Sequence, residues 1–118
     1  MTPFGLFLKN IRVSRGYQLT QMALSVGISP CYLSSMENGK KGSPSQKVLE
    51  RIIRELALSS DEIVELEAAK SASRKTYTLP DGLEIYQQVL VGNIWRRLDS
   101  IRPEQAACIE MILKLTEE

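Results

Sequence analysis

Hydrophobic residues up to position 70 recur at helical spacing in five successive stretches, and glycine, proline or polar residues separate each stretch from the next. Apolar side chains spaced three and four residues apart lie on one face of an α-helix, so each stretch predicts one amphipathic helix. In chain order, the stripe residues are Phe4, Phe7, Leu8 and Ile11, then Leu19, Met22, Ala23 and Val26, then Tyr32, Leu33 and Met36, then Val48, Leu49, Ile52, Ile53 and Leu56, and finally Ile63 and Leu66. The pattern predicts five helices in the first half of the chain.

Residues that favour helix ends mark where these helices start and stop. Serines able to cap a helix N-terminus precede the third, fourth and fifth stripes, and one of them is followed by proline, which is tolerated at the first helical position. Glycines follow the first three stripes, where the chain must turn. These residues are Ser29 with Pro30, Ser45, Ser59, Gly16, Gly27 and Gly39. The fifth helix is expected to end near Lys70.

The helical pattern fails between Ser71 and Gly82, where polar residues lead to the turn sequence Pro-Asp-Gly, with a short extended piece expected at 76–79. We therefore predict a five-helix domain at residues 1–70, a linker at 71–82 and a helical self-association element at 83–118. Apolar residues cover more than one face of the two helices expected there, so these helices need the first half or a second copy of the chain to bury them. The residues expected to be buried in this way are Leu83, Tyr86, Leu90, Ile94, Trp95, Ile109, Ile112 and Leu113.

The composition is that of an ordinary globular protein, with 43% hydrophobic and 25% charged residues among 118. No apolar run approaches the roughly twenty residues that cross a bilayer, and the N-terminus lacks a secretory signal, so we expect a cytoplasmic protein without membrane contact. Cys31 and Cys108 are isolated and the chain has no histidine, which leaves neither a zinc site nor a His-activated nucleophile. We expect no cofactor, no metal and no enzymatic activity.

The net charge of +1 conceals a difference between the two halves. Up to Leu58, eight lysines and arginines outnumber three glutamates, whereas from Ser59 onward seven cations are outnumbered by eleven acidic residues. Nucleic-acid binding depends on local charge, so the basic half is expected to bind phosphate and the acidic half to do something else.

Residues 19–38 have the spacing that a helix-turn-helix requires. Ala23 is small where the two helices would cross most closely, and Gly27 permits the turn between them. Leu33 and Met36 are expected to pack from the second of these helices onto the first. The side chains left on the outer face are small or polar, which suits the major groove of DNA. They are Pro30, Cys31, Ser34 and Ser35.

The chain resembles the Cro/C1-type (XRE) family of transcriptional regulators over the runs GYQLTQMA (16–23) and VGISPCYLSSMENGKK (26–41). The resemblance implies a five-helix lambda-repressor-like domain whose third helix enters the major groove, binding as a homodimer to paired half-sites in double-stranded DNA, and often repression of its own promoter. By position, the residues implied to approach bases or adjacent phosphates are Ser29, Pro30, Cys31, Tyr32, Ser34 and Ser35. Those implied to hold the DNA backbone are Thr20, Gln21, Asn38, Lys40 and Lys41.

The chain departs from the family's pattern at two points. Many members carry a phosphate-contacting glutamine where this chain has Leu19, and Thr20 is the candidate substitute. The recognition face also has no arginine, lysine, glutamine or asparagine before Asn38, so the strong bidentate base contacts are absent and readout is expected to lean on DNA shape.

Other interpretations account for parts of the sequence. A generic helical bundle explains the stripes but not the spacing of Ala23, Gly27 and Leu33. The Gly-x-x-Gly run at 39–42 matches RNA-binding KH domains, which need flanking strands that this sequence lacks. The second functional hypothesis is an antitoxin that binds a partner protein through its tail. The apolar content of residues 83–115 favours homodimerisation instead, because toxin-binding tails are often disordered until bound.

Overall fold

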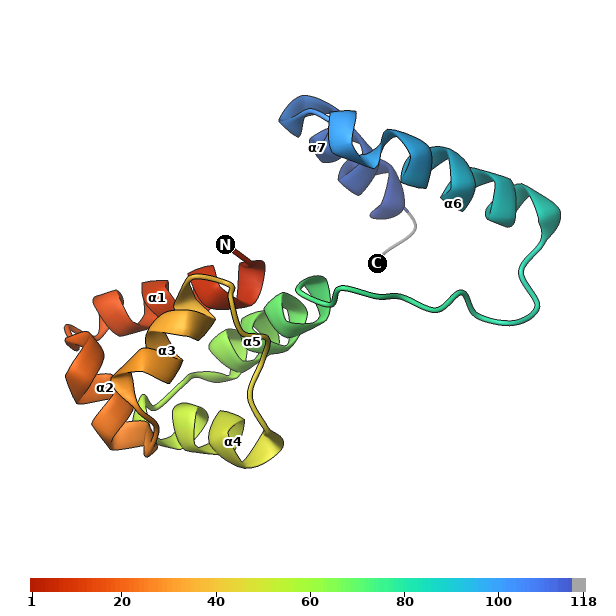
Figure 1. Ribbon diagram of the computed structural model, residues 1–118. Coiled ribbons are helices and arrows are strands. Elements are labelled where there is room, and N and C mark those ends of the chain that lie inside the picture. Colours follow the sequence, from red (N-terminus) through yellow and green to blue (C-terminus); the bar gives the residue numbers. More distant parts are fainter. Residues whose placement is uncertain (116–118) are drawn as a thin grey trace. The chain divides into compact units, whose positions relative to one another are not determined.

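The computed structural model describes residues 1–115, and within this range the chain contains helices and no strands, which confirms the predicted all-α class. The helices are α1 (Pro3–Ser14), α2 (Leu19–Val26), α3 (Pro30–Glu37), α4 (Gln46–Glu55), α5 (Ser60–Ala72), α6 (Ile85–Arg97), the 3-10 helix η1 (Leu98–Ser100) and α7 (Pro103–Leu113). Internal contacts divide the chain into two compact units, Met1–Tyr77 and a second that begins at Thr78 (Figure 1).

The helix ends form where the capping residues predicted them. The hydroxyl oxygens of Ser29, Ser45 and Ser59 accept hydrogen bonds from backbone N–H groups three residues on, at 3.1, 3.4 and 3.2 Å, which satisfies donors that have no partner within the helix. Gly27 ends α2 with a φ of +81°, a left-handed conformation that favours glycine. The cap of α1 was not predicted: Thr2 accepts a hydrogen bond from the Gly5 N–H at 3.1 Å.

Helix α5 continues to Ala72, two residues beyond its expected end near Lys70. The reason is a pair of hydrogen bonds at Ser73, whose hydroxyl donates to the Ala69 carbonyl at 2.7 Å and accepts from the Phe4 N–H at 2.8 Å. Ser73 thereby ties the end of α5 to the free N–H groups at the start of α1. Residues 76–79 form no strand.

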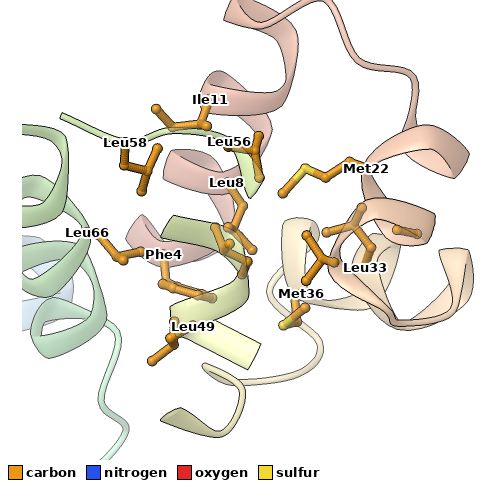
Figure 2. Packing of buried hydrophobic residues seen from close by; sticks show 13 residues of the cluster. Phe4, Leu8, Ile11, Met22, Leu33, Met36, Leu49, Leu56, Leu58 and Leu66 are labelled. Carbon is orange, nitrogen blue, oxygen red and sulfur yellow. The ribbon is translucent and has the colours of Figure 1, made fainter. Parts of the chain in front are cut away.

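The apolar core of the first unit draws side chains from all five of its helices (Figure 2). Twelve of its thirteen residues belong to the stripes expected from the sequence, and Leu58, in the turn between α4 and α5, is the addition. Its members are Phe4, Leu8, Ile11, Met22, Ala23, Val26, Leu33, Met36, Leu49, Ile52, Leu56, Leu58 and Leu66. The remaining stripe residues, among them Phe7, Tyr32 and Ile53, are partly buried against this cluster. Helical periodicity therefore identified the core.

Arg15 joins α1 to the start of α5. Its guanidinium makes two hydrogen bonds to the Glu62 carboxylate, at 2.6 and 2.8 Å, and a third to the Leu56 carbonyl at 3.2 Å. The Arg15 hydrogen bond, helped by the Ser59 backbone N–H, lowers the pKa of Glu62 from 4.5 to about 2. The carboxylate thus stays ionised in the folded protein at pH values where it would be protonated in the unfolded chain.

This contact predicts an acid-dependent loss of stability. A carboxyl group whose pKa is lowered by folding stabilises the protein above its unfolded value of 4.5, and that contribution disappears as the pH falls toward 2. Urea unfolding at a series of pH values measures the free energy of unfolding. Between pH 5 and 2 this free energy should fall less steeply for Glu62→Gln than for the wild type. Glu65→Gln, which changes an exposed glutamate of the same helix, should follow the wild-type curve. Identical curves for Glu62→Gln and the wild type would contradict the assignment.

The second unit has no core of its own within the described residues. Neither α6 nor α7 has a buried residue, and an open groove of about 250 Å³ lies between them, lined in part by Ile94, Ile101 and Ile109. Of the eight residues expected to need a partner, Leu83, Ile94 and Ile109 are half-buried, and the other five are exposed. These five are Tyr86, Leu90, Trp95, Ile112 and Leu113.

The apolar pattern predicts one long helix that includes Leu98 and a second from Pro103 to Leu115. In the structure Leu98 lies in η1, and α7 ends at Leu113. Among residues 1–115, no helix is both long enough and apolar enough to span a membrane. The same range has no cluster of three or more His, Cys, Asp or Glu side chains that could hold a metal ion, and both cysteines are exposed free thiols.

Candidate DNA-binding surface

Helices α2 and α3 pack in the manner predicted for a helix-turn-helix. Ala23, Val26 and Leu33 have no exposed surface, so a side chain larger than Ala23 would not fit between the two helices. Met22 of α2 belongs to the same buried cluster as Leu33 and Met36 of α3 (Figure 2). This packing fixes the angle at which α3 projects from the unit.

The turn between α2 and α3 is held by an arginine that the sequence did not reveal. Arg51, on α4, donates from Nη1 to the Val26 carbonyl at 3.5 Å. A Cβ atom placed on Gly27 would lie 2.6 Å from the same Nη1, so a larger residue would have to displace the end of the Arg51 side chain. The left-handed backbone is what favours glycine at this position.

The outer face of α3 carries the side chains predicted to face DNA, with differing exposure. Pro30 and Cys31 are exposed, whereas Ser34 and Ser35 are only partly so. The Asn38 amide donates to the Ser34 hydroxyl at 3.4 Å, which links two residues assigned to base and backbone contact. A serine hydroxyl can donate one hydrogen bond and accept two, so both residues could still bind a base edge.

Tyr32 and Ser29 hold positions that serve the fold as well as any contact with DNA. Tyr32 is half-buried and packs against the apolar core, so only part of its ring is available at the surface. The Ser29 hydroxyl is engaged as the N-cap of α3. Both residues therefore help to place the helix that would enter the groove.

At the start of α2, Thr20 and Gln21 are exposed, as their predicted role requires. The side-chain oxygen Oε1 of Gln21 accepts a hydrogen bond from the Gln18 N–H at 2.8 Å, which caps the helix and leaves the side-chain N–H groups of Gln21 for another acceptor. Leu19 packs against the core instead of facing solvent. An apolar residue there is explained by packing, and the polar surface at this end of α2 comes from its neighbours.

A buried ion pair supports α3 from behind. Glu37 is 5% exposed, and its carboxylate accepts hydrogen bonds from Arg12 Nε at 2.8 Å and from Arg12 Nη2 at 3.0 Å. The third nitrogen, Arg12 Nη1, donates to the Tyr17 carbonyl at 3.2 Å. Hydrogen bonding to Glu37 raises the pKa of Arg12, so the guanidinium remains charged. The pair anchors the C-terminal end of α3 to α1 and to the turn between α1 and α2, where Tyr17 lies.

Glycine at position 5 allows α1 to approach the same end of α3. A Cβ atom on Gly5 would lie 2.6 Å from the Glu37 carbonyl oxygen and closer still to that of Met36. No real side chain tolerates such contacts with backbone atoms. Gly5 and Arg12 together give α3 a rigid base on α1.

These ion pairs revise the charge argument made from the sequence. Arg12 and Arg15 were counted among the cations available to phosphate, but both are paired with glutamates inside the unit. Lysines 40, 41 and 47 are exposed, and they lie in the segment between α3 and α4 and in the first turn of α4. Positive charge is thus placed directly after α3, and the first half as a whole has fewer unpaired cations than its count suggested.

Comparison with known proteins agrees with this geometry. Residues 8–63 match the family described as Helix-turn-helix. A protein of Bacillus subtilis (strain 168), described as the uncharacterized HTH-type transcriptional regulator RghRB, is 36% identical over 52 residues, which are 44% of this chain and 37% of that protein. The matched region thus spans little more than a third of that relative's length. No solved structure matches the chain significantly. The match over residues 8–63 is to the helix-turn-helix family, which agrees with the resemblance of the sequence to regulators of the Cro/C1 (XRE) type.

Proposed function

We propose that this chain is a sequence-specific DNA-binding regulator of transcription that acts as a dimeric repressor. The observation that carries the proposal is the exposed face of α3, held rigidly by Gly5 and the Arg12–Glu37 pair and followed by lysines that no acidic side chain neutralises within residues 1–115. A fixed helix with small polar side chains can enter the major groove, and neighbouring cations can hold the phosphates on either side.

In this proposal, Pro30, Cys31, Ser34 and Ser35 approach base edges, while Ser29 and Tyr32 lie at the margin of the contact. Thr20, Gln21 and Asn38 with Lys40 and Lys41 bind the DNA backbone. The second unit joins two chains, so that two copies of α3 meet two half-sites.

Selection of bound sequences from a random DNA pool tests the proposal directly. We expect enrichment of a two-fold symmetric sequence whose half-sites lie about 10 base pairs, or a multiple of that, from centre to centre. Enrichment of a single asymmetric half-site would support DNA binding but contradict the symmetric dimer. A pool without any enrichment would contradict sequence-specific binding.

The lysines after α3 give a second expectation. Lys40→Ala combined with Lys41→Ala should weaken binding to all DNA sequences alike and reduce the slope of log affinity against log salt by roughly 1.8, because each phosphate contact contributes about 0.9. Filter binding or fluorescence anisotropy at several salt concentrations measures this slope.

The matched control removes two cations elsewhere on the chain. Arg74→Ala combined with Lys75→Ala changes two exposed residues in the segment after α5, and should leave the slope unchanged. Equal slopes for the wild type and the Lys40, Lys41 variant would place these lysines outside the DNA contact.

A partner protein bound through the tail, as in an antitoxin, remains the second candidate because the second unit exposes so much apolar surface. Copurification of this chain with a second protein, in place of a homodimer, would favour it.

A further inference from the structure

The groove between α6 and α7 opens on one side of the hairpin that these two helices form. Ile94 of α6 and Ile109 of α7 line it, and Ile101 lies in the turn that joins the helices. Ile94 and Ile109 are both half-buried, which marks the sides of α6 and α7 that face the groove. Helical spacing from these two residues identifies what else lies on the same side.

On α6, the groove side carries apolar residues along most of its length. Leu90 and Tyr86 precede Ile94 by one and two helical turns, and Arg97 follows it by one, so the four share one side of the helix. Arg97 also lines the groove, in agreement with this spacing.

On α7, Gln105 and Ile112 lie one turn before and one turn after Ile109, and Gln105 again lines the groove. Trp95 of α6 and Met111 of α7, which are also exposed, point more than a quarter of a turn away from it. We call the residues on the groove side the groove face. They are Tyr86, Leu90, Ile94, Arg97, Gln105, Ile109 and Ile112.

The groove face is open to water in the single chain. Tyr86, Leu90 and Ile112 are 71%, 56% and 65% exposed, although the groove runs between their helices. Neither helix of the hairpin has a buried residue, and two short helices without a core are not stable by themselves. A further surface must therefore cover this face.

Its apolar area is of the order that a two-chain contact requires. An aromatic side chain presents roughly 150–250 Å² and an aliphatic one roughly 60–120 Å², so the exposed fractions and the half-buried isoleucines together give roughly 200–400 Å². One partner of a standard homodimer contributes roughly 500 Å² of apolar surface, and the rest of its interface is polar. Asn93 and Gln105, which line the groove, supply polar groups.

The charge on the groove face favours a second copy of the chain as the covering surface. Arg97 is its one charged residue, at the end nearest the turn. A copy laid on it in the same direction would bring Arg97 against Arg97, whereas a copy turned end for end separates the two guanidinium groups.

The first unit offers no matching surface, because its exposed apolar residues within the helices are scattered over α1, α2 and α5. They are Leu6, Val13, Leu24 and Val64.

We propose that the α6–α7 hairpins of two chains pack groove face to groove face, turned end for end, as a four-helix bundle. This inference rests on the dimer in the proposed function and specifies the surface that forms it. Such a contact is two-fold symmetric, so each chain gives and receives the same contacts.

The spacing on α6 sets the register of this contact. Tyr86 lies four residues before Leu90, and Arg97 lies three residues after Ile94. When Leu90 packs on the partner's Ile94, Tyr86 therefore comes opposite the partner's Arg97. A guanidinium over a tyrosine ring is a favourable contact, and the symmetry forms it twice.

Lysine substitutions test the groove face in the full chain. Leu90→Lys and Ile112→Lys should each raise the dimer dissociation constant roughly 100-fold or more in sedimentation equilibrium, because each places a charge in an apolar contact in both copies. The matched controls are Trp95→Lys on α6 and Met111→Lys on α7, which replace apolar residues at least as exposed on other sides of the same helices. These two should leave the constant within a few-fold of the wild type.

Disulfide trapping tests the end-for-end direction. In a background with Cys31→Ala and Cys108→Ala, the Tyr86→Cys and Arg97→Cys chains are mixed under reducing conditions and then mildly oxidised. The mixture should give a covalent dimer on a non-reducing gel, since the paired positions come close enough for a disulfide. Either variant alone should stay monomeric, because its two copies are separated by roughly 16 Å along the helices.

Each outcome decides the inference. Equal weakening by Trp95→Lys and Leu90→Lys would overturn the groove face, and a full chain that is monomeric at all concentrations would overturn pairing with a second copy. Covalent dimers of Tyr86→Cys alone, or none in the mixture, would overturn the end-for-end direction. None of these measurements involves DNA. A chain whose hairpins pair in this way but which selects no DNA sequence would contradict the proposed function and leave the interface in place.

Discussion

Gly5→Ala is expected to lower the free energy of unfolding of the first unit by about 3 kcal/mol or more, at the upper end of the range for overpacked cores. The added Cβ would meet the carbonyl oxygens of Met36 and Glu37, which belong to a helix backbone and cannot rotate away. Helix α1 or α3 must shift instead. Urea unfolding followed by far-UV circular dichroism measures the loss, and DNA affinity should fall with it because α3 would be displaced.

Gly42→Ala provides the matched control for this substitution. A Cβ atom on Gly42 would meet nothing within 4 Å, and its backbone is not left-handed, so stability should change by less than about 0.5 kcal/mol. If Gly5→Ala were as stable as Gly42→Ala, the close packing of α1 on α3 would be wrong.

Truncation after Lys75 is expected to produce a folded monomer that binds a palindromic operator at least about 100-fold more weakly than the full chain, because the second head no longer benefits from the first being bound. All thirteen core residues precede the cut, so the helical spectrum and unfolding midpoint of the first unit should persist. Burying half of the eight tail residues at about 1.5–3 kcal/mol each supplies roughly 6–12 kcal/mol, which offsets much of the estimated cost of joining two chains.

Sedimentation equilibrium and operator titration decide this prediction together. A truncated chain that stays dimeric with undiminished affinity would move the self-association surface to the first unit. The tail would then need a different partner, and the antitoxin hypothesis would gain support.

Periodicity and capping chemistry made most of the first unit predictable. Twelve core residues and the caps Ser29, Ser45 and Ser59 follow from spacing and local hydrogen bonding, both of which are properties of neighbouring residues in the chain. The extra residues of α5 did not follow, because Ser73 gains its partner, the Phe4 N–H, from a helix sixty-nine positions away.

The residues on the outer face of α3 could be listed from the sequence, but the contacts that hold α3 in place could not be predicted. The outer face of α3 consists of the positions that remain once the apolar, inward-facing residues are identified. The neighbouring sequence, however, does not distinguish Arg12, which pairs with the buried Glu37, from an exposed cation such as Lys40. Gly5 likewise reads as an ordinary glycine until α3 is placed over it. Charge counts along a sequence overestimate the available cations for this reason, since they include those already paired inside the fold.

The hydrogen bond from Phe4 to Ser73 also limits how far the two units can move apart. Ser73 fixes the end of α5 on α1, the first unit ends at Tyr77, and α6 begins after Glu84, so residues 78–84 connect the two units and, fully extended, span roughly 25 Å. Two such tethers, one from each chain, would separate the heads of a dimer, and one turn of B-DNA is about 34–36 Å. In a dimer joined through the tail, the length of this tether would therefore decide which operator spacings both heads can occupy. Lengthening it by a few residues should admit more widely separated half-sites while leaving every protein–DNA contact unchanged.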